Sequence, residues 1–200
     1  MAKQGVIRKG AITKGKIAKA AAELFDAKGY SGAGLTDILV QAGVPKGSIY
    51  FHFPGGKEEI AAEAINIAGK DIQEFLDGAL TKSKHPSEAI NLVIGVFKAR
   101  LVEAEFRSGC PVSAVGLELS GTQSLALDAC SAAFSAWIKT LEFYLKNYVA
   151  EEQAAKLADA VFCLIQGALI LSRVTGDLEH LSNAEVYSGK LLRDALSKQV

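Results

Sequence analysis

The chain has 200 residues, half of them hydrophobic, and its 22 basic side chains balance 22 acidic ones, which allows a packed core of one or two domains. The zero net charge hides an asymmetry, because residues 1–57 carry nine Lys and Arg against three acids and residues 58–200 carry 13 against 19. The three cysteines are widely spaced, which argues against a disulfide framework. The N-terminus has no apolar stretch like that of a secretory signal, and no apolar run approaches the ~20 residues of a membrane span. We therefore expect a cytoplasmic protein without metal or cofactor.

Helical spacing of Ala, Leu, Lys and Glu predicts an all-α chain of about nine helices, because β-branched runs with period-two alternation are scarce. The four prolines lie within the first 111 residues, and we interpret each as a boundary between elements. The predicted helices span residues 13–28, 35–42, 45–53, 57–80, 87–106, 113–119, 122–148, 151–175 and 184–198. Gly29 and Gly43 are expected to end the first two.

Residues 36–53 are the most informative stretch, because two short helices meet there at Gly43. A sharp turn between helices needs a residue that tolerates positive φ, and glycine does so. Ile38 and Leu39 on the first helix, with Ile49 and Phe53 on the second, are spaced to bury the inner faces. The outer face of the second helix then presents groups suited to phosphate oxygens and base edges: Lys46, Ser48, Tyr50, Phe51 and His52, with Gly47 leaving room for the backbone to approach.

This segment resembles the DNA-binding domain of the TetR family of bacterial regulators. The resemblance covers about the first 60 residues and rests on positions 20–25, 28–30, 37–38, 42–44, 46–53 and 57–58. It implies a helix-turn-helix DNA-binding domain over residues 1–56 and an effector-binding and dimerisation domain over residues 57–200. It also implies that the third helix enters the major groove of double-stranded DNA and that a homodimer reads a palindromic operator.

Carried over position by position, the resemblance implies base contacts by Lys46 and Gly47 and phosphate contacts by Tyr50 and His52. Lys57 is expected to contact a further phosphate, helped by the positive N-terminal end of the fourth helix. Two alternatives remain open. Tyr50 and His52 could be ordinary half-buried aromatic residues, and Lys57 could be a solvated start of a helix.

Two positions depart from the family pattern. Ala33 and Gly34 stand where the family often has a Thr or Ser pair, so we expect Thr36 to take the hydroxyl role. The loop over residues 54–56 is one residue longer than the commonest family form. Phe51 is an additional candidate, as a contact to a thymine methyl group.

The eighth and ninth helices are expected to form the dimer interface as a four-helix bundle, as the resemblance implies. The eighth helix supports this independently, because it is apolar nearly all round and such a helix is buried on all sides. The alternative is that these residues only fill the core of one chain. The predicted interface residues are Val161, Leu164, Ile165, Ala168, Leu169, Leu191 and Ala195.

The effector is expected to be a small apolar or aromatic molecule, because the candidate pocket walls are aromatic and aliphatic. The same residues also describe any helical core, which is the alternative for each of them. The predicted ligand-binding residues are Phe97, Leu101, Cys110, Phe134, Trp137, Ile138, Leu141, Phe162 and Gln166.

Cys110 has a sharper alternative role as a sensor of oxidants or electrophiles. Arg107 and a nearby helix start could lower the pKa of its thiol. The Gly109-Cys110-Pro111 segment between the fifth and sixth helices resembles a TetR subgroup in which some members sense with a cysteine. The competing interpretation is a small buried hydrophobic residue.

The sequence therefore predicts a ligand-responsive transcriptional repressor that binds its operator as a homodimer and is released by a small effector. A redox-sensing repressor acting through Cys110 is the alternative. An enzyme on a helical scaffold has little support, because no Gly-rich phosphate loop follows a strand and the three histidines are far apart in the sequence. No membrane partner is expected.

Overall fold

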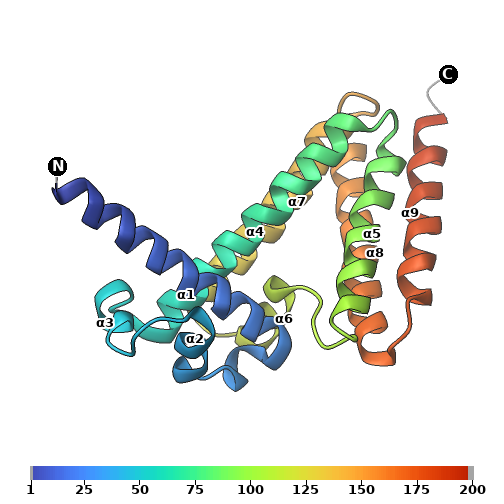
Figure 1. Cartoon of the computed structure of the whole chain (residues 1–200). Coiled ribbons are helices and arrows are strands. Elements are labelled where there is room, and N and C mark those ends of the chain that lie inside the picture. The colour runs from blue at the N-terminus through green and yellow to red at the C-terminus, as the bar shows by residue number, and fades with distance from the viewer. Residues whose placement is uncertain (1, 198–200) are drawn as a thin grey trace. The chain divides into compact units, whose positions relative to one another are not determined.

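The structure, a computed structural model, describes residues 2–197, and within this range it holds nine α-helices and no strand (Figure 1). The all-α prediction is confirmed. The helices are α1 (Ala2–Gly32), α2 (Leu35–Ala42), α3 (Ser48–His52), α4 (Gly56–Lys82), α5 (Pro86–Glu103), α6 (Pro111–Leu119), α7 (Leu125–Leu145), α8 (Glu151–Thr175) and α9 (Glu179–Ser197).

Most helix boundaries differ from the predicted ones by a few residues, and three of the differences have a clear structural description. Helix α1 begins at Ala2, well before the predicted residue 13. Helix α3 is shorter than predicted, because the segment from Pro45 forms a turn in which the N–H of Ser48 donates to the carbonyl of Pro45 at 2.9 Å. Helix α9 begins at Glu179 instead of residue 184, since the Asp177 carboxylate accepts from the N–H of Glu179 at 2.9 Å and caps the helix. The predicted last residue of that helix, at position 198, lies outside the described residues.

The chain forms two compact units that differ from the predicted cut at Gly56. Unit 1 consists of residues 2–70 and 110–133, and unit 2 consists of residues 71–109 and 134–197. Helices α4 and α7 contribute their first parts to unit 1 and their last parts to unit 2. Unit 1 includes α6 because that helix packs against α1. The functional division into residues 1–56 and 57–200 stays a prediction.

Unit 1 has its own apolar core, built where α1 packs against α2 and α6. The four inner-face residues predicted for the helix-turn-helix, Ile38, Leu39, Ile49 and Phe53, are all buried. The first parts of α4 and α7 approach closely, because a Cβ atom at Gly69 would lie 2.9 Å from the Cβ of Ala133. Only a glycine permits that spacing without a shift of the backbone.

Unit 2 is a helical layer in which α9 packs against both α5 and α8 (Figure 1). The largest buried side chain in this unit is Trp137 of α7. Helix α8 is long and apolar enough to cross a membrane by length and composition, and 44% of its most apolar 18-residue stretch is buried. The core helix of a soluble protein meets the same criterion, so this observation is weak support for a membrane span.

Candidate nucleic-acid interface

The turn between α2 and α3 is closed by Gly43, as the sequence predicts. Gly43 has φ 64° and ψ 37°, in the left-handed region. Its N–H donates to the carbonyl of Val40 at 3.1 Å, and the N–H of Val44 donates to that of Leu39 at 3.1 Å. This pair of bonds is a Schellman motif, which satisfies the last carbonyls of α2 and redirects the chain sharply into the next helix.

Helix α3 is held from its inner side by two apolar residues. Ile49 is buried, and Phe53, which follows the helix, is completely buried. The N–H of Phe53 donates to the carbonyl of Ile49 at 2.7 Å and completes the last turn. The Lys14 ammonium lies 5.2 Å from the centre of the Phe53 ring and forms an ion pair with Glu63 at 3.2 Å. These contacts fix a short helix whose other side is free to meet a ligand.

The outer side of α3 carries large exposed aromatic residues. Tyr50 and Phe51 are each 81% exposed, which is unusual for rings that could pack in a core. Lys46 and Gly47 are exposed in the preceding turn, and Ser48 is half-buried at the start of the helix. The alternative of a half-buried aromatic residue therefore does not hold for Tyr50.

His52 lies differently from its exposed neighbours. It is half-buried, and a Cβ atom at Gly10 of α1 would lie 3.7 Å from its Cε1 atom. Its ring also makes an edge-to-face contact with Phe51 at 4.8 Å between centroids. The imidazole thus supports the position of the exposed Phe51 ring, whereas its predicted phosphate contact stays a prediction.

Thr36 is exposed in the first turn of α2, but it does not cap that helix. The N-cap residue is Gly34, which has no side chain to accept from the free N–H groups. A phosphate contact by the Thr36 hydroxyl remains a prediction.

Lys57 contacts the turn between α1 and α2. Its ammonium lies 4.7 Å from the centre of the Tyr30 ring and donates to the carbonyl of Ser31 at 3.4 Å. Burial lowers the pKa of Lys57, and the negative charge of Glu118 partly offsets that effect. The interpretation of Lys57 as a merely solvated start of a helix is therefore wrong.

Glu118 also belongs to this region, although it was not among the residues predicted for it. Its carboxylate accepts from the N–H of Tyr30 at 2.7 Å and from the N–H of Ser31 at 2.8 Å. Burial alone would raise the pKa of Glu118, but the hydrogen bonds from Ser31 and Tyr30 and the charge of Lys57 lower it overall. The sequence offers only a weak signal, an acid near the end of a short helix 88 residues away from its partner.

Most predicted ligand-binding residues of unit 2 pack against one another as core. The ring of Trp137 contacts Phe134 edge to face at 5.3 Å and stacks on Phe162 at 6.5 Å between centroids. Leu101 and Leu141 are completely buried, while Ile138 and Gln166 are half-buried. Phe97 alone of the nine lines a described cavity, of about 140 Å³, together with Asp71, Ile72, Phe75, Val93, Val96 and Arg100.

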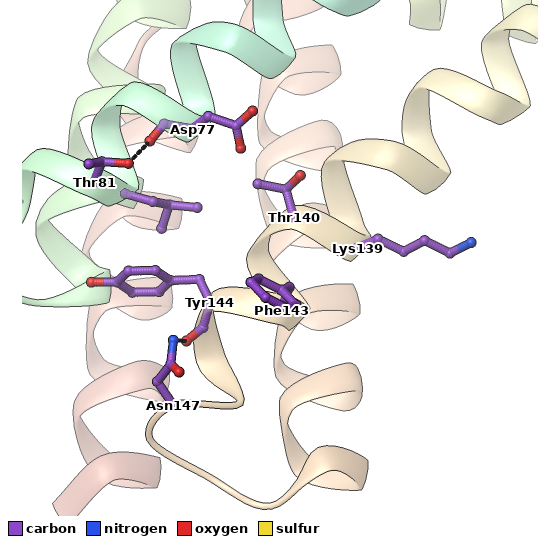
Figure 2. A pocket seen from close by; sticks show the side chains of 8 residues that line it. Asp77, Thr81, Lys139, Thr140, Phe143, Tyr144 and Asn147 are labelled. Atoms are coloured by element: carbon purple, nitrogen blue, oxygen red, sulfur yellow. Dashed lines mark hydrogen bonds between the residues drawn. The ribbon is translucent and has the colours of Figure 1, made fainter.

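A second, more open groove of about 400 Å³ lies between the last parts of α4 and α7 (Figure 2). None of its lining residues was predicted as a ligand contact. The groove has a mixed polar and apolar lining, made by Asp77, Leu80, Thr81, Lys139, Thr140, Phe143, Tyr144 and Asn147. Its charged and hydroxyl groups distinguish it from the apolar pocket that the sequence predicted.

Cys110 belongs to unit 1, where it is the N-cap residue of α6 and only 2% exposed. Burial raises the pKa of its thiol, although hydrogen bonds with Ser113 act in the opposite direction. Burial and the neighbouring Cys110 likewise raise the pKa of Cys130, to about 12. A buried thiol with a raised pKa reacts slowly, so the environment of Cys110 favours the small hydrophobic residue over the sensor.

The predicted dimer residues need a correction. Val161, Ile165, Ala168, Leu169 and Ala195 are buried inside unit 2 itself, because these sides of α8 and α9 face each other and the unit's core. Leu191 is half-buried, and only Leu164 is exposed. The exposed apolar residues of the two helices, which we call the α8–α9 face, are Leu164, Ile170, Leu171, Val174, Val186 and Tyr187.

A helix-turn-helix whose second helix is exposed and aromatic, with only helices among the described elements, is typical of a DNA-binding regulator of transcription. Residues 17–64 match the family described as bacterial regulatory proteins of the tetR family, and residues 86–186 match the C-terminal domain described as transcriptional regulator LmrA/YxaF-like. The chain belongs to the TetR family of transcriptional regulators, and neither the family nor its relatives are enzymes.

Two relatives from Bacillus subtilis (strain 168) are similar over most of their length. The HTH-type transcriptional regulator LmrA is 34% identical over 158 residues, covering 78% of this chain and 84% of the relative. The HTH-type transcriptional regulator YxaF is 33% identical over 163 residues, covering 81% and 85%. A TetR regulator structure from Chloroflexus aurantiacus has a TM-score of 0.78 and 25% identity, covering 94% of this chain and 98% of that one.

Proposed function

We propose that this protein is a cytoplasmic, ligand-responsive repressor that binds a palindromic operator as a homodimer through the outer side of α3. Its release from DNA follows binding of a small apolar or aromatic effector in unit 2. A shift in the separation of two recognition helices prevents simultaneous contact with two half-sites, so a modest ligand energy is sufficient.

The exposure of Tyr50 and Phe51 beside Lys46 carries this proposal. Two large rings at 81% exposure leave apolar surface in water unless a partner covers it. The basic charge of residues 1–57 selects a polyanion as that partner. We propose that Lys46 contacts a guanine edge or a phosphate, Tyr50 a phosphate and Phe51 a thymine methyl group.

The test is binding to duplex DNA selected by the wild-type protein from a random-sequence library. Lys46→Ala and Tyr50→Ala are each expected to weaken binding about tenfold to a hundredfold, since a good base or phosphate contact contributes about 1–3 kcal/mol. Lys82→Ala is the matched control, because this exposed lysine lies in unit 2. If both α3 variants bind as tightly as the control, the proposal is wrong.

The homodimer is proposed to form through the α8–α9 face. Val174 is 79% exposed, Tyr187 is 61% exposed and Leu171 is 50% exposed, although each is apolar. Several large apolar side chains exposed on two neighbouring helices are typical of an interface between protein chains. The same face explains why α8 is apolar on its outer side as well as in the core.

The effector site is proposed to include the cavity beside Phe97. Its lining is mainly aliphatic and aromatic, with the charged groups of Asp71 and Arg100 also present. A volume of about 140 Å³ accommodates a single aromatic ring, so a small ligand fits without rearrangement. Screening small aromatic compounds for release of the wild-type protein from its selected duplex tests this part of the proposal.

A further inference from the structure

The carboxylate of Glu118 joins α6 to the turn between α1 and α2. Helix α1 breaks at Gly29, and the next two N–H groups along the chain belong to Tyr30 and Ser31. Oε1 of Glu118 accepts from the N–H of Tyr30 at 2.7 Å, and Oε2 accepts from the N–H of Ser31 at 2.8 Å. Both oxygens of one carboxylate are therefore used on consecutive backbone donors within unit 1.

The backbone at Gly29 leaves the space that this carboxylate occupies. Gly29 has φ 76° and ψ 169°, a conformation that side chains other than hydrogen rarely allow. A Cβ atom there would lie 1.9 Å from Oε1 of Glu118. The backbone conformation favours glycine, and a Cβ atom there would displace the carboxylate from the two N–H donors, so the contact depends on glycine at this position.

The same turn receives the ammonium of Lys57 from α4. The cation lies over the Tyr30 ring and donates to the carbonyl of Ser31, and the Lys57 and Glu118 charges stabilise each other. The Tyr30 ring in turn packs 5.5 Å from the buried ring of Phe25 in α1. Helices α1, α4 and α6 therefore meet at one point.

The position of this turn determines where α2 starts. Ala33 is completely buried, and α2 begins at Leu35 behind Gly34, which supplies no side-chain cap. The start of α2 is thus fixed by the preceding turn and not by a cap of its own. Helix α2 then sets α3 through the Schellman motif at Gly43.

We propose that Glu118 is a positioning residue for DNA binding, which holds the α1–α2 turn, and through it α2 and α3, in the position that docks against duplex DNA. The proposal rests on the proposed DNA-binding function. Because coupling between two sites is reciprocal, if the Glu118 contact positions α3 for DNA, then DNA binding must in turn stabilise α6 through the same contact.

Glu118→Gln and Glu118→Asp test the proposal, with Glu152→Gln as the matched control on an exposed ion pair of α8 in unit 2. Glutamine keeps the shape and loses the charge, whereas aspartate keeps the charge and is too short to reach both donors. Binding to the selected duplex is measured by fluorescence anisotropy at one salt concentration. We expect both Glu118 variants to bind about threefold to tenfold more weakly than the control, the equivalent of losing one ordinary hydrogen bond.

The sign of the effect separates positioning from general electrostatics. Removing a negative charge from a DNA-binding protein strengthens binding to phosphates, so a weaker Glu118→Gln variant cannot be explained by net charge. Hydrogen exchange with and without duplex supplies the second measurement. DNA should slow exchange in residues 112–119 of the wild type and of Glu152→Gln, but not in the Glu118 variants, whereas a residue that only stabilises the fold would leave this response unchanged.

Two results would overturn the proposal: Glu118 variants that bind as tightly as the control, or a DNA-induced change in α6 exchange that is the same in the wild type and the variants. Failure of the DNA-binding function itself is distinguishable, because the wild-type protein would then select no duplex. A Glu118→Gln variant that fails to fold, judged by circular dichroism, leaves Glu118→Asp to decide.

Discussion

Replacing Gly29 by alanine disfavours the backbone conformation of the α1–α2 turn and fills the space that the Glu118 carboxylate occupies. The backbone at φ 76° and ψ 169° costs alanine about 1–3 kcal/mol. The added Cβ atom, 1.9 Å from Oε1, also forces the carboxylate away from Tyr30 and Ser31. Each lost hydrogen bond contributes about 0.5–1.5 kcal/mol, the range for an ordinary bond, because water reaches this carboxylate. We therefore expect Gly29→Ala to lower the free energy of unfolding by about 2–6 kcal/mol.

Gly43→Ala is the matched control for this substitution. Gly43 also has positive φ, at 64°, but no atom outside its immediate neighbours lies within 4 Å of a Cβ atom there. Its cost is backbone strain alone, about 1–2 kcal/mol. Urea unfolding followed by circular dichroism, at one protein concentration because the chain is expected to dimerise, measures both variants.

A double-mutant cycle with Glu118→Ala separates strain from the lost contact. In the wild type Glu118→Ala is expected to cost about 1–3 kcal/mol, and in the Gly29→Ala background almost nothing, because the hydrogen bonds are already gone. Equal costs of Glu118→Ala in both backgrounds would refute this account of the turn. So would a Gly29→Ala variant that is no less stable than Gly43→Ala.

Three further predictions concern other parts of the chain. Val174→Glu should convert the dimer to a monomer in analytical ultracentrifugation. Phe143→Glu, at a similarly exposed apolar residue of α7, should leave the dimer intact. A Val174→Glu variant that stays dimeric would exclude the α8–α9 face as the dimer interface. Gly69→Ala should lower the melting temperature by several degrees because its Cβ meets that of Ala133, and adding Ala133→Gly should restore most of the loss; no recovery in the double variant would contradict this cause. Cys110 should react with N-ethylmaleimide far more slowly in the native protein than the exposed cysteine of α8, as followed by mass spectrometry, and comparable rates would return Cys110 to consideration as a sensor.

The helices were predictable from the sequence because their signals are local. Gly43 shows where α2 ends, and the spacing of Ile49 and Phe53 shows which side of α3 is buried. The start of α3 was predicted three residues early, because Pro45 is as well suited to a turn as to the first position of a helix.

The faces of α8 could not be assigned in the same way. A helix that is apolar nearly all round carries no periodicity that distinguishes core from interface. Burial by the neighbouring helices of unit 2 decides the matter: Val161 and Ile165 lie in the core, whereas Leu171 and Val174 stay exposed. The Glu118 contact was unpredictable for a related reason, since it joins residues 88 positions apart through backbone donors that have no side-chain signature.

Lys57 can either hold the α1–α2 turn or contact a DNA phosphate. The interaction energies favour the phosphate when DNA is present. In the structure its ammonium has an aromatic ring and one carbonyl at 3.4 Å, a cation–π contact of about 0.5–1 kcal/mol with a long hydrogen bond. A phosphate oxygen offers a charge-assisted bond of about 1.5–3 kcal/mol, so the lysine is expected to leave the ring when DNA binds. Lys57→Gln should then weaken binding to all duplexes to a similar degree and reduce the salt dependence of the binding constant by about one counterion. An unchanged salt dependence would mean that the Lys57 ammonium stabilises only the α1–α2 turn beside Tyr30 and does not contact a phosphate.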